Sequence, residues 1–436
     1  MPVLKSEKFV GIETFYSNLE GIGGKLKTKP EDFIVTEISN YPKKDDKGIF
    51  TIADVTSINW ENNLLIRQLS KALKISRNRI NFAGTKDKRA KTKQIMSFYK
   101  ISIDDLKNIK LKDVKINNFY NSNKAVKIGN LIGNSFLIKI RDIEEKNIID
   151  KIEKYYDFFQ KEKGFPNFFG IQRFGITRPN THIIGKNIVK GDFKKAALSY
   201  IGKPSEYEDK YTYQIRKKFD ETKDFKWALQ NYPKNLNYEL SILNKLAINP
   251  KNYIQALKEL PKNLLTMFIY GYQSYLFNKI ISDRIKNNIP INKAILGDII
   301  LPVKNDKIND EYIFVNKDNI NKVNNQISKQ KAYVSGLLIG AESIFSKGEM
   351  GEIEHKIIEK EKIDKRDFII PEIPFISSNG SRRPIFSKIK NLELCLEKDN
   401  QNKEKKILNI KFDLNKGSYA TSFLREIMKA KTIKDY

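Results

Sequence analysis

The chain contains apolar residues that recur with a two-residue period, which is typical of strands with one buried face. Phe33 and Val35 alternate with Ile34 and Thr36, and a Pro-Glu-Asp turn before them sets the start of a strand. Similar patterns predict further strands at residues 95–103, 126–140, 297–301, 312–315 and 407–414. Pro302 is expected to end the strand at 297–301, because proline cannot donate a hydrogen bond within a sheet.

A period of three to four residues predicts amphipathic helices between these strands. It is clear at residues 60–73, and residues 263–284 form the longest apolar periodic stretch of the chain, for which we predict a core helix. Further helices are predicted at residues 142–159, 192–201, 224–229, 253–260, 352–360 and 423–431. The mixture of both periods predicts an α+β fold.

The length of 436 residues suggests two or three domains. Near Pro179 the strand patterns give way to helices separated by charged loops, and the linker at 369–374 contains two prolines. We therefore predict a discontinuous domain formed by residues 1–180 and 371–436. An inserted, helix-rich α+β domain of residues 181–370 interrupts it.

The composition is strongly basic, with 80 Lys and Arg residues against 52 Asp and Glu and a net charge of +28. Such an excess implies a polyanionic partner, with nucleic acid as the leading candidate and an acidic membrane surface as the weaker one. No apolar run reaches the roughly 18 residues that a membrane span needs, and the N-terminal sequence lacks the apolar core of a signal peptide. We therefore expect a cytoplasmic protein that does not contact a membrane.

Cysteine and histidine are almost absent, with Cys395, His182 and His355 as the only examples. A single cysteine excludes an intrachain disulfide, and the lack of a Cys/His cluster argues against a zinc site. We predict no metal site, so acid–base chemistry would have to use carboxylates, lysine, tyrosine or water.

Candidate chemistry is concentrated in the loop at residues 82–94, which is expected to join two strands. This loop places one acid, Asp87, among five bases, and Gly84 supplies the backbone freedom of a tight turn. The bases are Lys86, Lys88, Arg89, Lys91 and Lys93. Nearby positive charge lowers the pKa of a carboxylate, so Asp87 suits a nucleophile better than a proton donor, and the cations could hold RNA. The charge pattern alone favours the alternative, a solvated basic turn in which Asp87 only pairs with its neighbours.

Residues 164–175 form a second dense segment, with four aromatic residues and three glycines interspersed with Asn, Gln and Arg. This composition suits a loop in which a nucleobase stacks on a ring, an interaction worth about 1–3 kcal/mol. Asn167 could then contact the base edge and Arg173 a phosphate. The alternative is a loop held in the core by its aromatic rings. The tyrosines of residues 263–284 could also touch RNA, although a core helix is the simpler interpretation.

Five segments together resemble the motifs of the TruD family of tRNA pseudouridine synthases, in its archaeal form. Residues 84–94 follow G-x-K-D-[KR]-x-A-x-T-x-Q, and residues 27–37 follow K-x-x-P-E-D-F-x-V-x-E, both at every fixed position. Residues 166–175 follow P-N-[YF]-F-G-x-Q-R-F-G. Residues 271–278 and 417–426 follow G-x-Q-S-x-L-F-N and G-S-[FY]-A-T-S-x-x-R-E.

The resemblance implies a fold, a reaction and a partner. The fold is a pseudouridine synthase catalytic domain with a mixed or antiparallel sheet, interrupted by an inserted TRUD domain. The reaction isomerises uridine to pseudouridine through a catalytic aspartate, without cofactor or metal. In bacterial members the substrate is uridine 13 of tRNA, and archaeal relatives can accept other RNAs. We expect a monomeric enzyme that acts on tRNA.

The same resemblance implies roles for individual residues. Asp87 is implied to be catalytic, either by attacking the ribose or by assisting the removal of a ribose proton. Phe33, Asn167 and Tyr419 are implied to hold the target nucleotide, and Phe169 is implied to shape the pocket. Taken alone, Phe33 would indicate a core aromatic, and Tyr419, where bacterial members have Phe, could simply pack beneath its loop. The remaining predicted substrate-binding residues are Lys27, Lys86 and Arg173.

Two other classes of protein fit the basic composition. One is a non-catalytic RNA-binding or ribosome-assembly protein. The other is an RNA methyltransferase, which needs a glycine-rich turn from a strand into a helix. The glycine cluster at residues 21–24 leads into Pro30 instead, which argues against a helix there. For Arg382 and Arg383, we expect solvated side chains that bind phosphate at most.

Overall fold

The structure, a computed structural model, describes residues 2–144, 146–304, 307–309, 311–399 and 405–436. These residues form two compact units. Unit 1 comprises Ser17–Phe165 and Ser387–Tyr436, and unit 2 comprises Pro2–Tyr16 and Pro166–Phe386. The chain therefore passes from one unit to the other near residues 16, 165 and 386, whereas the sequence pattern places the domain boundaries near 180 and 370. The assignment of a catalytic and an inserted domain stays a prediction.

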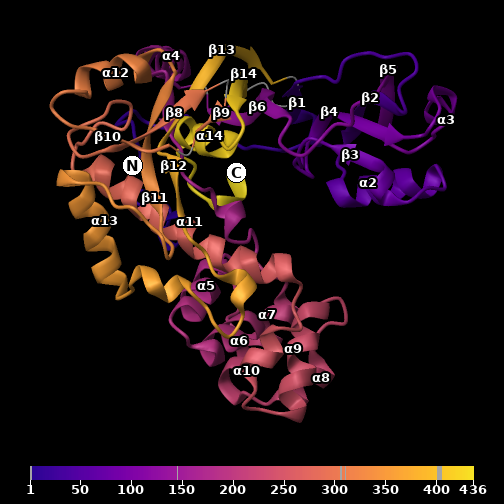
Figure 1. Cartoon of the computed structure of the whole chain (residues 1–436), viewed down its shortest axis with the longest axis vertical. Coiled ribbons are helices and arrows are strands. Elements are labelled where there is room, and N and C mark those ends of the chain that lie inside the picture. The colour runs from indigo at the N-terminus through magenta and orange to yellow at the C-terminus, as the bar shows by residue number, and fades with distance from the viewer. Residues whose placement is uncertain (1, 145, 305–306, 310, 400–404) are drawn as a thin grey trace. The chain divides into compact units, whose positions relative to one another are not determined.

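Unit 1 is built on a nine-stranded mixed sheet, whose strands are labelled in Figure 1. Their spatial order is β5-β2-β4-β1-β6-β14-β13-β7, with β3 paired to β4. The strands are β1 (Phe33–Ser39), β2 (Phe50–Ile58), β3 (Ile80–Phe82), β4 (Lys91–Tyr99), β5 (Val114–Ser122), β6 (Leu131–Glu144), β7 (Gly164–Pro166), β13 (Phe386–Lys398) and β14 (Lys405–Asn415). The helices are α2 (Asn62–Ala72), α3 (Ile103–Lys107), α4 (Ile148–Glu162) and α14 (Ala420–Met428). β1 and β4 run parallel while β1 and β6 run antiparallel, so the predicted α+β fold with a mixed sheet is confirmed.

The alternation predicted for β1 is confirmed by its burial pattern. Phe33 and Val35 are buried, and the residues between and after them are half-buried. On the same face, Phe136 of β6 stacks on Phe412 of β14 with 5.1 Å between ring centroids. Phe423 of α14 contacts the Phe412 ring at 4.7 Å. The main core of unit 1 therefore lies between α14 and the sheet face that carries Phe33.

The boundaries predicted around β6 in unit 1 are wrong by several residues. The helix predicted at 142–159 begins only at Ile148, because β6 continues to Glu144 along its partner β14. The strand predicted at 126–140 begins at Leu131, because a glycine turn precedes it. Both errors arise where strand pairing or a turn overrides the local hydrophobic pattern.

Strands β2 and β5 are not predicted from the sequence. β2 lies between β4 and β5 and has five successive buried residues, 51–55. It therefore lacks the alternation of buried and exposed residues that marks a strand with one solvent-exposed face. β4, predicted at 95–103, begins at Lys91 and ends at Tyr99. The loop that carries Asp87 therefore shortens to residues 83–90.

Unit 2 combines many helices with a smaller, five-stranded sheet, as predicted for a helix-rich α+β part of the chain. The helices are α1 (Lys5–Phe9), α5 (Thr181–Val189), α6 (Phe193–Ile201), α7 (Lys210–Thr222), α8 (Phe225–Asn231), α9 (Asn237–Ile248), α10 (Tyr253–Leu257), α11 (Lys262–Lys286), α12 (Ile320–Ser328) and α13 (Gly348–Glu361). The strands are β8 (Ile299–Lys304), β9 (Lys307–Ile308), β10 (Ile313–Phe314), β11 (Ala332–Leu338) and β12 (Ser381–Pro384), in the order β10-β8-β11-β12 with β9 paired to β8.

The expectation that Pro302 ends its strand is wrong. β8 continues through Pro302 because the neighbouring backbone groups still find partners. The N–H of Val303 donates to the carbonyl of Lys331 at 2.9 Å, and the Pro302 carbonyl accepts from the N–H of Asn309 at 2.8 Å. One missing donor is therefore tolerated within this ladder.

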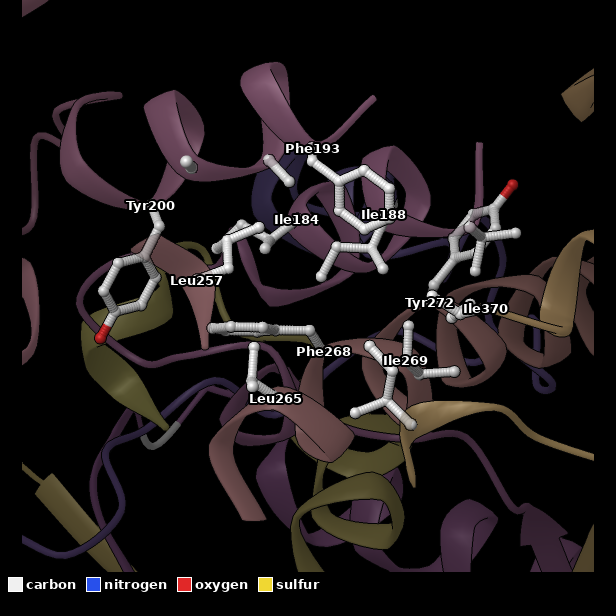
Figure 2. Close-up of a cluster of buried hydrophobic side chains, with 14 of the residues drawn as sticks. Ile184, Ile188, Phe193, Tyr200, Leu257, Leu265, Phe268, Ile269, Tyr272 and Ile370 are labelled. Atoms are coloured by element: carbon white, nitrogen blue, oxygen red, sulfur yellow. The ribbon is translucent and has the colours of Figure 1, made fainter. Parts of the chain in front are cut away.

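The predicted core helix is confirmed as α11, which lies at the centre of the core of unit 2. Phe268 and Tyr272 of α11 are buried and pack among aliphatic residues such as Ile184 of α5 and Leu257 of α10 (Figure 2). Tyr270 of the same helix is 46% exposed. Most of the aromatic residues on this helix therefore belong to the core, but Tyr270 does not.

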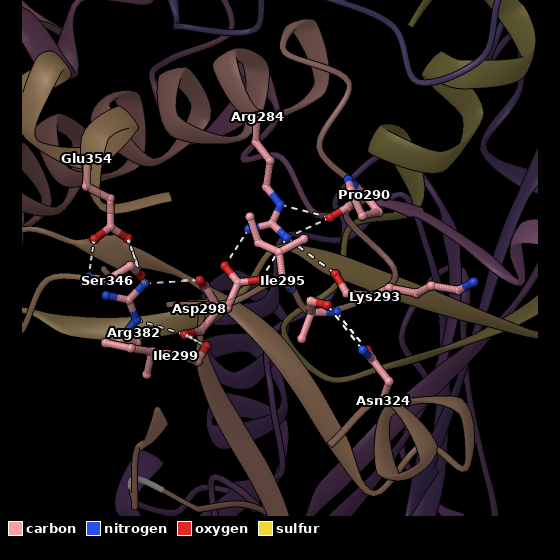
Figure 3. A network of polar contacts seen from close by, with 12 residues as sticks. Arg284, Pro290, Lys293, Ile295, Asp298, Ile299, Asn324, Ser346, Glu354 and Arg382 are labelled. Carbon is pink, nitrogen blue, oxygen red and sulfur yellow. Dashed lines mark hydrogen bonds and ion pairs between the residues drawn. The ribbon is translucent and has the colours of Figure 1, made fainter. Parts of the chain in front are cut away.

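Two of the buried ion pairs of unit 2 are drawn in Figure 3. Arg284 of α11 contacts Asp298, just before β8, at 2.6 Å, and both side chains are 0% exposed. Arg382 of β12 contacts Glu354 of α13 at 2.7 Å, with side chains 1% and 0% exposed. The expectation that Arg382 is a solvated phosphate binder is therefore wrong, because its charge is buried and already compensated.

The pKa of His182 on α5 tests whether its ring is buried in unit 2. Its ring is buried among Phe9, Phe174 and Tyr275, with centroids 5.0 to 5.3 Å away. Burial disfavours the imidazolium and lowers the pKa of His182 from 6.5 to about 3. The unfolded chain then binds one more proton than the folded chain between these values. The free energy of unfolding is therefore highest above pH 6.5. The His182 shift should lower it by about 2 kcal/mol between pH 6.5 and 5.

Proton NMR of the imidazole rings measures this shift directly. The His182 ring resonance should not titrate between about pH 8 and pH 5, since the pKa lies far below that window. The chain has only two histidines, so a His355→Asn variant leaves the His182 signal alone. A titration midpoint near 6.5 would contradict the prediction.

Candidate active site

The eight predicted site residues fall into two groups, one in each compact unit. Unit 1 holds Lys27, Phe33, Lys86, Asp87 and Tyr419, and unit 2 holds Asn167, Phe169 and Arg173.

Asp87 lies on the loop of residues 83–90 between β3 and β4, and its side chain is 47% exposed. Backbone hydrogen bonds at Ala83 and Ala90 fix the two ends of the loop, and Ala90 is buried in the main core. Because β4 runs parallel to β1, the loop enters β4 at the end of the sheet where β1 begins with Phe33. The fold thus brings Asp87 to the face of β1 on which Phe33 lies.

Within the described residues, Asp87 forms its ion pair with Lys27, 60 positions earlier, and not with a base of its own loop. The Nζ atom of Lys27 lies 3.3 Å from Oδ1 of Asp87 and 4.2 Å from the centroid of the Phe33 ring. Lys27 has a φ angle of 52°, which residues with side chains rarely adopt, and its side chain is only 12% exposed. Phe33 is 1% exposed, and the face of its ring makes a cation–π contact with the Lys27 ammonium. The structure therefore brings three predicted residues together as a carboxylate, an ammonium and a ring.

Lys86, the residue before Asp87, is directed into the protein. Its Nζ atom lies 2.6 Å from Oε2 of Glu37 on β1, and the two side chains are 4% and 2% exposed. Removing either partner would leave a buried charge uncompensated, so this pair holds the loop on the strand. In this structure Lys86 positions the loop, and the neighbouring bases that remain exposed are Lys88 and Arg89.

Tyr419 lies just past the end of β14, at the N-terminus of α14, and it is half-buried. The next residue, Ala420, belongs to the same buried cluster as Phe33 and Ala90. The start of α14 and the loop of Asp87 therefore share one core, on the sheet face that carries Phe33.

In unit 2, Asn167 is 4% exposed and uses both ends of its side-chain amide. Its Oδ1 atom accepts a hydrogen bond from Nη2 of Arg383 at 2.8 Å, and its Nδ2 atom donates to the carbonyl of Pro384 at 3.0 Å. Nη1 of Arg383 also donates to the backbone carbonyl of Asn167 at 2.6 Å. Asn167 therefore positions Arg383 here, and its amide could contact a base only by exchanging one of these bonds.

Arg383 is a candidate site residue that the sequence interpretation missed. Its guanidinium carbon lies 3.9 Å from the ring centroid of Phe169 and 4.9 Å from that of Phe277. The expectation of a solvated side chain is wrong, because Arg383 is half-buried and held by stacking and hydrogen bonds. Successive residues of a strand point to opposite faces, so two adjacent arginines in an extended segment signal that one of them faces inward.

Polar residues of α11 hold the segment of residues 166–175 in place. Asn278 accepts from the N–H of Phe169 at 2.8 Å and donates to its carbonyl at 2.9 Å. Ser274 accepts a hydrogen bond from Nε of Arg173 at 3.4 Å. The signal for this role is the motif at 271–278, since Gln, Ser and Asn on a core helix are costly to bury without partners.

Known proteins match this chain along almost its whole length. A family model described as "tRNA pseudouridine synthase D (TruD)" matches residues 9–427. The chain belongs to the TruD family. A relative from Methanococcoides burtonii, named "Probable tRNA pseudouridine synthase D", is 40% identical over 98% of each chain. A relative of the same name from Pyrococcus abyssi is 36% identical over 95% of this chain and 98% of its own.

A solved structure shows the same fold. The crystal structure of a TruD protein from Methanosarcina mazei covers 100% of both chains, with a TM-score of 0.90 and 37% sequence identity. As a TruD protein, the chain is an enzyme of the tRNA pseudouridine synthase class, an isomerase. In the part of this TruD chain that the structure describes, no helix is both long enough and apolar enough to cross a membrane. Nor do its described His, Cys, Asp and Glu residues form a group of three or more that could hold a metal ion.

Proposed function

We propose that this TruD enzyme converts uridine 13 of tRNA to pseudouridine, with Asp87 as the catalytic residue. The supporting observation is the accessible carboxylate of Asp87, paired with Lys27 above the Phe33 ring, in a loop that matches the TruD catalytic motif. The reaction breaks the C1′–N1 bond, turns the base and joins C1′ to C5. The hydrogen displaced from C5 is balanced by one gained at N1, so the reaction needs no redox partner.

Asp87 has two possible roles, attack on C1′ or acceptance of a ribose proton, and both need an ionised carboxylate within reach of the sugar. Its 47% exposure leaves that carboxylate accessible, and the Lys27 ammonium at 3.3 Å fixes its orientation. We assign to Phe33 a supporting role that acts through Lys27. A base could stack on the Phe33 ring only if Lys27 moved away, because the ring is buried beneath the ammonium.

Asn167 and Phe169 of unit 2 are proposed to act on the target nucleotide. The contact of Tyr419 with that nucleotide stays a prediction. Asn167 and Phe169 fix the plane of the Arg383 guanidinium by hydrogen bonding and stacking. A guanidinium held in this way carries a fixed positive charge that attracts a substrate phosphate. In this proposal Arg383 supplies that charge, and Asn167 acts mainly by orienting it.

The charge of the chain supports tRNA as the partner. With a net charge of +28, the protein can displace many counterions from the phosphate backbone. A uridine inside a folded tRNA must be extruded, at a cost of a few kcal/mol, before its C1′ is accessible. Phosphate contacts and base stacking offset that cost.

An unmodified tRNA transcript tests the proposal. Incubated with the protein and no cofactor, the transcript should acquire pseudouridine at position 13, mapped by chemical labelling and primer extension. A transcript with cytidine at position 13 is the control and should stay unmodified. Conversion elsewhere would refute the position, and binding without any conversion would favour the non-catalytic RNA-binding alternative. The monomeric state and the cytoplasmic location stay predictions.

A further inference from the structure

Unit 2 contains a polar pocket of about 570 Å³ next to Phe169. Its lining comes from the motif segment, from α11, and from the end of β11 together with the loop before β12. The lining residues are Phe169, Arg173, Tyr270, Gln273, Ser274, Leu338, Ser377, Ser378, Asn379, Gly380 and Ser381. The volume lies within the roughly 300–1,000 Å³ range of small-ligand sites, so one nucleotide fits. No carboxylate lines the pocket and one guanidinium does, which favours an anionic ligand.

Arg173 gives the pocket its charge. Its guanidinium carbon lies 5.8 Å from the Phe169 ring and 5.9 Å from the Tyr270 ring, and its Nε atom donates to Ser274. Across the described residues, Arg173 forms no ion pair with a carboxylate, in contrast to the buried Arg284. A half-buried guanidinium that is positioned by rings, with its terminal nitrogens not paired to an acid, suits a phosphate.

Tyr270 provides a ring that a base can reach. It is 46% exposed, whereas Phe268 and Tyr272 on the same helix are buried in the core. The nearby loop adds the exposed polar side chains of Ser377 and Asn379, which can pair with a ribose hydroxyl or a phosphate oxygen. Because these side chains are exposed, the pocket is open to solvent and a continuing RNA chain can enter and leave it.

The loop before β12 has a fixed shape. Gly380 has a φ angle of 81°, and a Cβ atom added there would lie 2.6 Å from the backbone nitrogen of Gly340. Gln273 of α11 is buried and donates from Nε2 to the carbonyl of Ile339 and to Oγ of Ser378, at 2.6 and 2.8 Å. The pocket wall is therefore preformed, which reduces the entropy that binding must offset.

We propose that this pocket binds a nucleotide of the RNA substrate other than the target uridine, with its phosphate on Arg173 and its base against Tyr270. The proposal rests on the RNA-modifying function proposed above and adds a second contact to it. Its role is affinity and not chemistry, because neither group needs to touch the reacting atoms.

Binding and kinetics of a Tyr270→Ala variant test the pocket. The variant should bind the tRNA transcript about tenfold more weakly and show a KM raised by a similar factor, with kcat nearly unchanged, because stacking is lost without a change in the chemistry. Tyr270→Phe keeps the ring and should recover most of the affinity. Tyr238→Ala is the matched control, since Tyr238 is 48% exposed on α9 of the same unit and should bind like the wild type.

The dissociation constant for the tRNA transcript tests the pocket independently of the proposed catalytic activity. If the wild type binds the transcript but converts no uridine, the catalytic proposal fails. The comparison of dissociation constants still shows whether the pocket binds a nucleotide of the RNA. Equal dissociation constants for wild type and Tyr270→Ala would overturn the pocket proposal. Competition by free uridine monophosphate at micromolar concentration, lost in Tyr270→Ala, would also overturn it by assigning the pocket to a free nucleotide.

Discussion

Replacing Asp87 by Asn should reduce pseudouridine formation by at least about a thousandfold, the scale seen when a catalytic group is removed. Asparagine has nearly the same shape but cannot act as an ionised nucleophile or accept a ribose proton. Asp87 is 47% exposed on a loop, and its ion pair with Lys27 at 3.3 Å contributes little to folding at such exposure. We therefore expect the variant to keep its fold and its affinity for tRNA.

The measurement is a single-turnover assay on the tRNA transcript, with enzyme in excess, combined with a binding titration. Asp104→Asn is the matched control. Asp104 is an exposed aspartate of unit 1 that pairs with Lys107 at the same distance, 3.3 Å, and its replacement should leave the rate unchanged. An Asp87→Asn enzyme that converts uridine at the wild-type rate would remove Asp87 from the mechanism.

Replacing Asp298 by Asn should destabilise unit 2 by about 3–5 kcal/mol, because it leaves the Arg284 charge buried without its counterion. Both side chains are 0% exposed and the atoms lie 2.6 Å apart. Figure 3 shows that the remaining donors of Arg284 point to the backbone carbonyls of Pro290 and Lys293, which bear no charge to replace the carboxylate. Neutral carbonyls cannot compensate a buried cation, so the loss should be large.

Urea-induced unfolding followed by circular dichroism measures this loss as a lower transition midpoint. Glu311→Gln is the control, since the pair of Lys304 and Glu311 is similarly short at 2.8 Å but its side chains are 64% and 68% exposed. Its removal should leave the midpoint unchanged, because water already solvates both charges. Equal shifts in the two variants would show that burial does not determine the strength of these pairs.

Features that depend on residues close together in the chain were predictable. The two-residue period of β1 predicts which residues face the core, and the apolar period of α11 predicts a buried helix, because each pattern reflects one element packing on one core. The mixed sheet was expected from the family resemblance and not from these patterns. The candidate residues followed from motifs, whose residue types and spacing are local properties of the sequence.

The exact ends of elements were less predictable. β6 runs past its predicted end because β14, more than 260 residues later, pairs with it to Glu144. β2 gives no alternating signal because both of its faces are buried, with Ala53 and Val55 packed in the cluster that contains α2 and Ile52 packed in a separate cluster. In each case the deciding partner is distant in the chain, so no window of neighbouring residues contains the information.

By itself, the sequence determined the α+β class, and it supplied the loop that carries Asp87 and the candidate site residues other than Arg383, because motifs and periods depend on residues near one another in the chain. Only the tertiary structure decided which charges meet. It pairs Asp87 with Lys27, buries Lys86 against Glu37, and stacks Arg383 on Phe169 where a solvated side chain was expected. The physical reason is that ion pairing and burial depend on distance in space, and folding brings together residues that the chain keeps far apart.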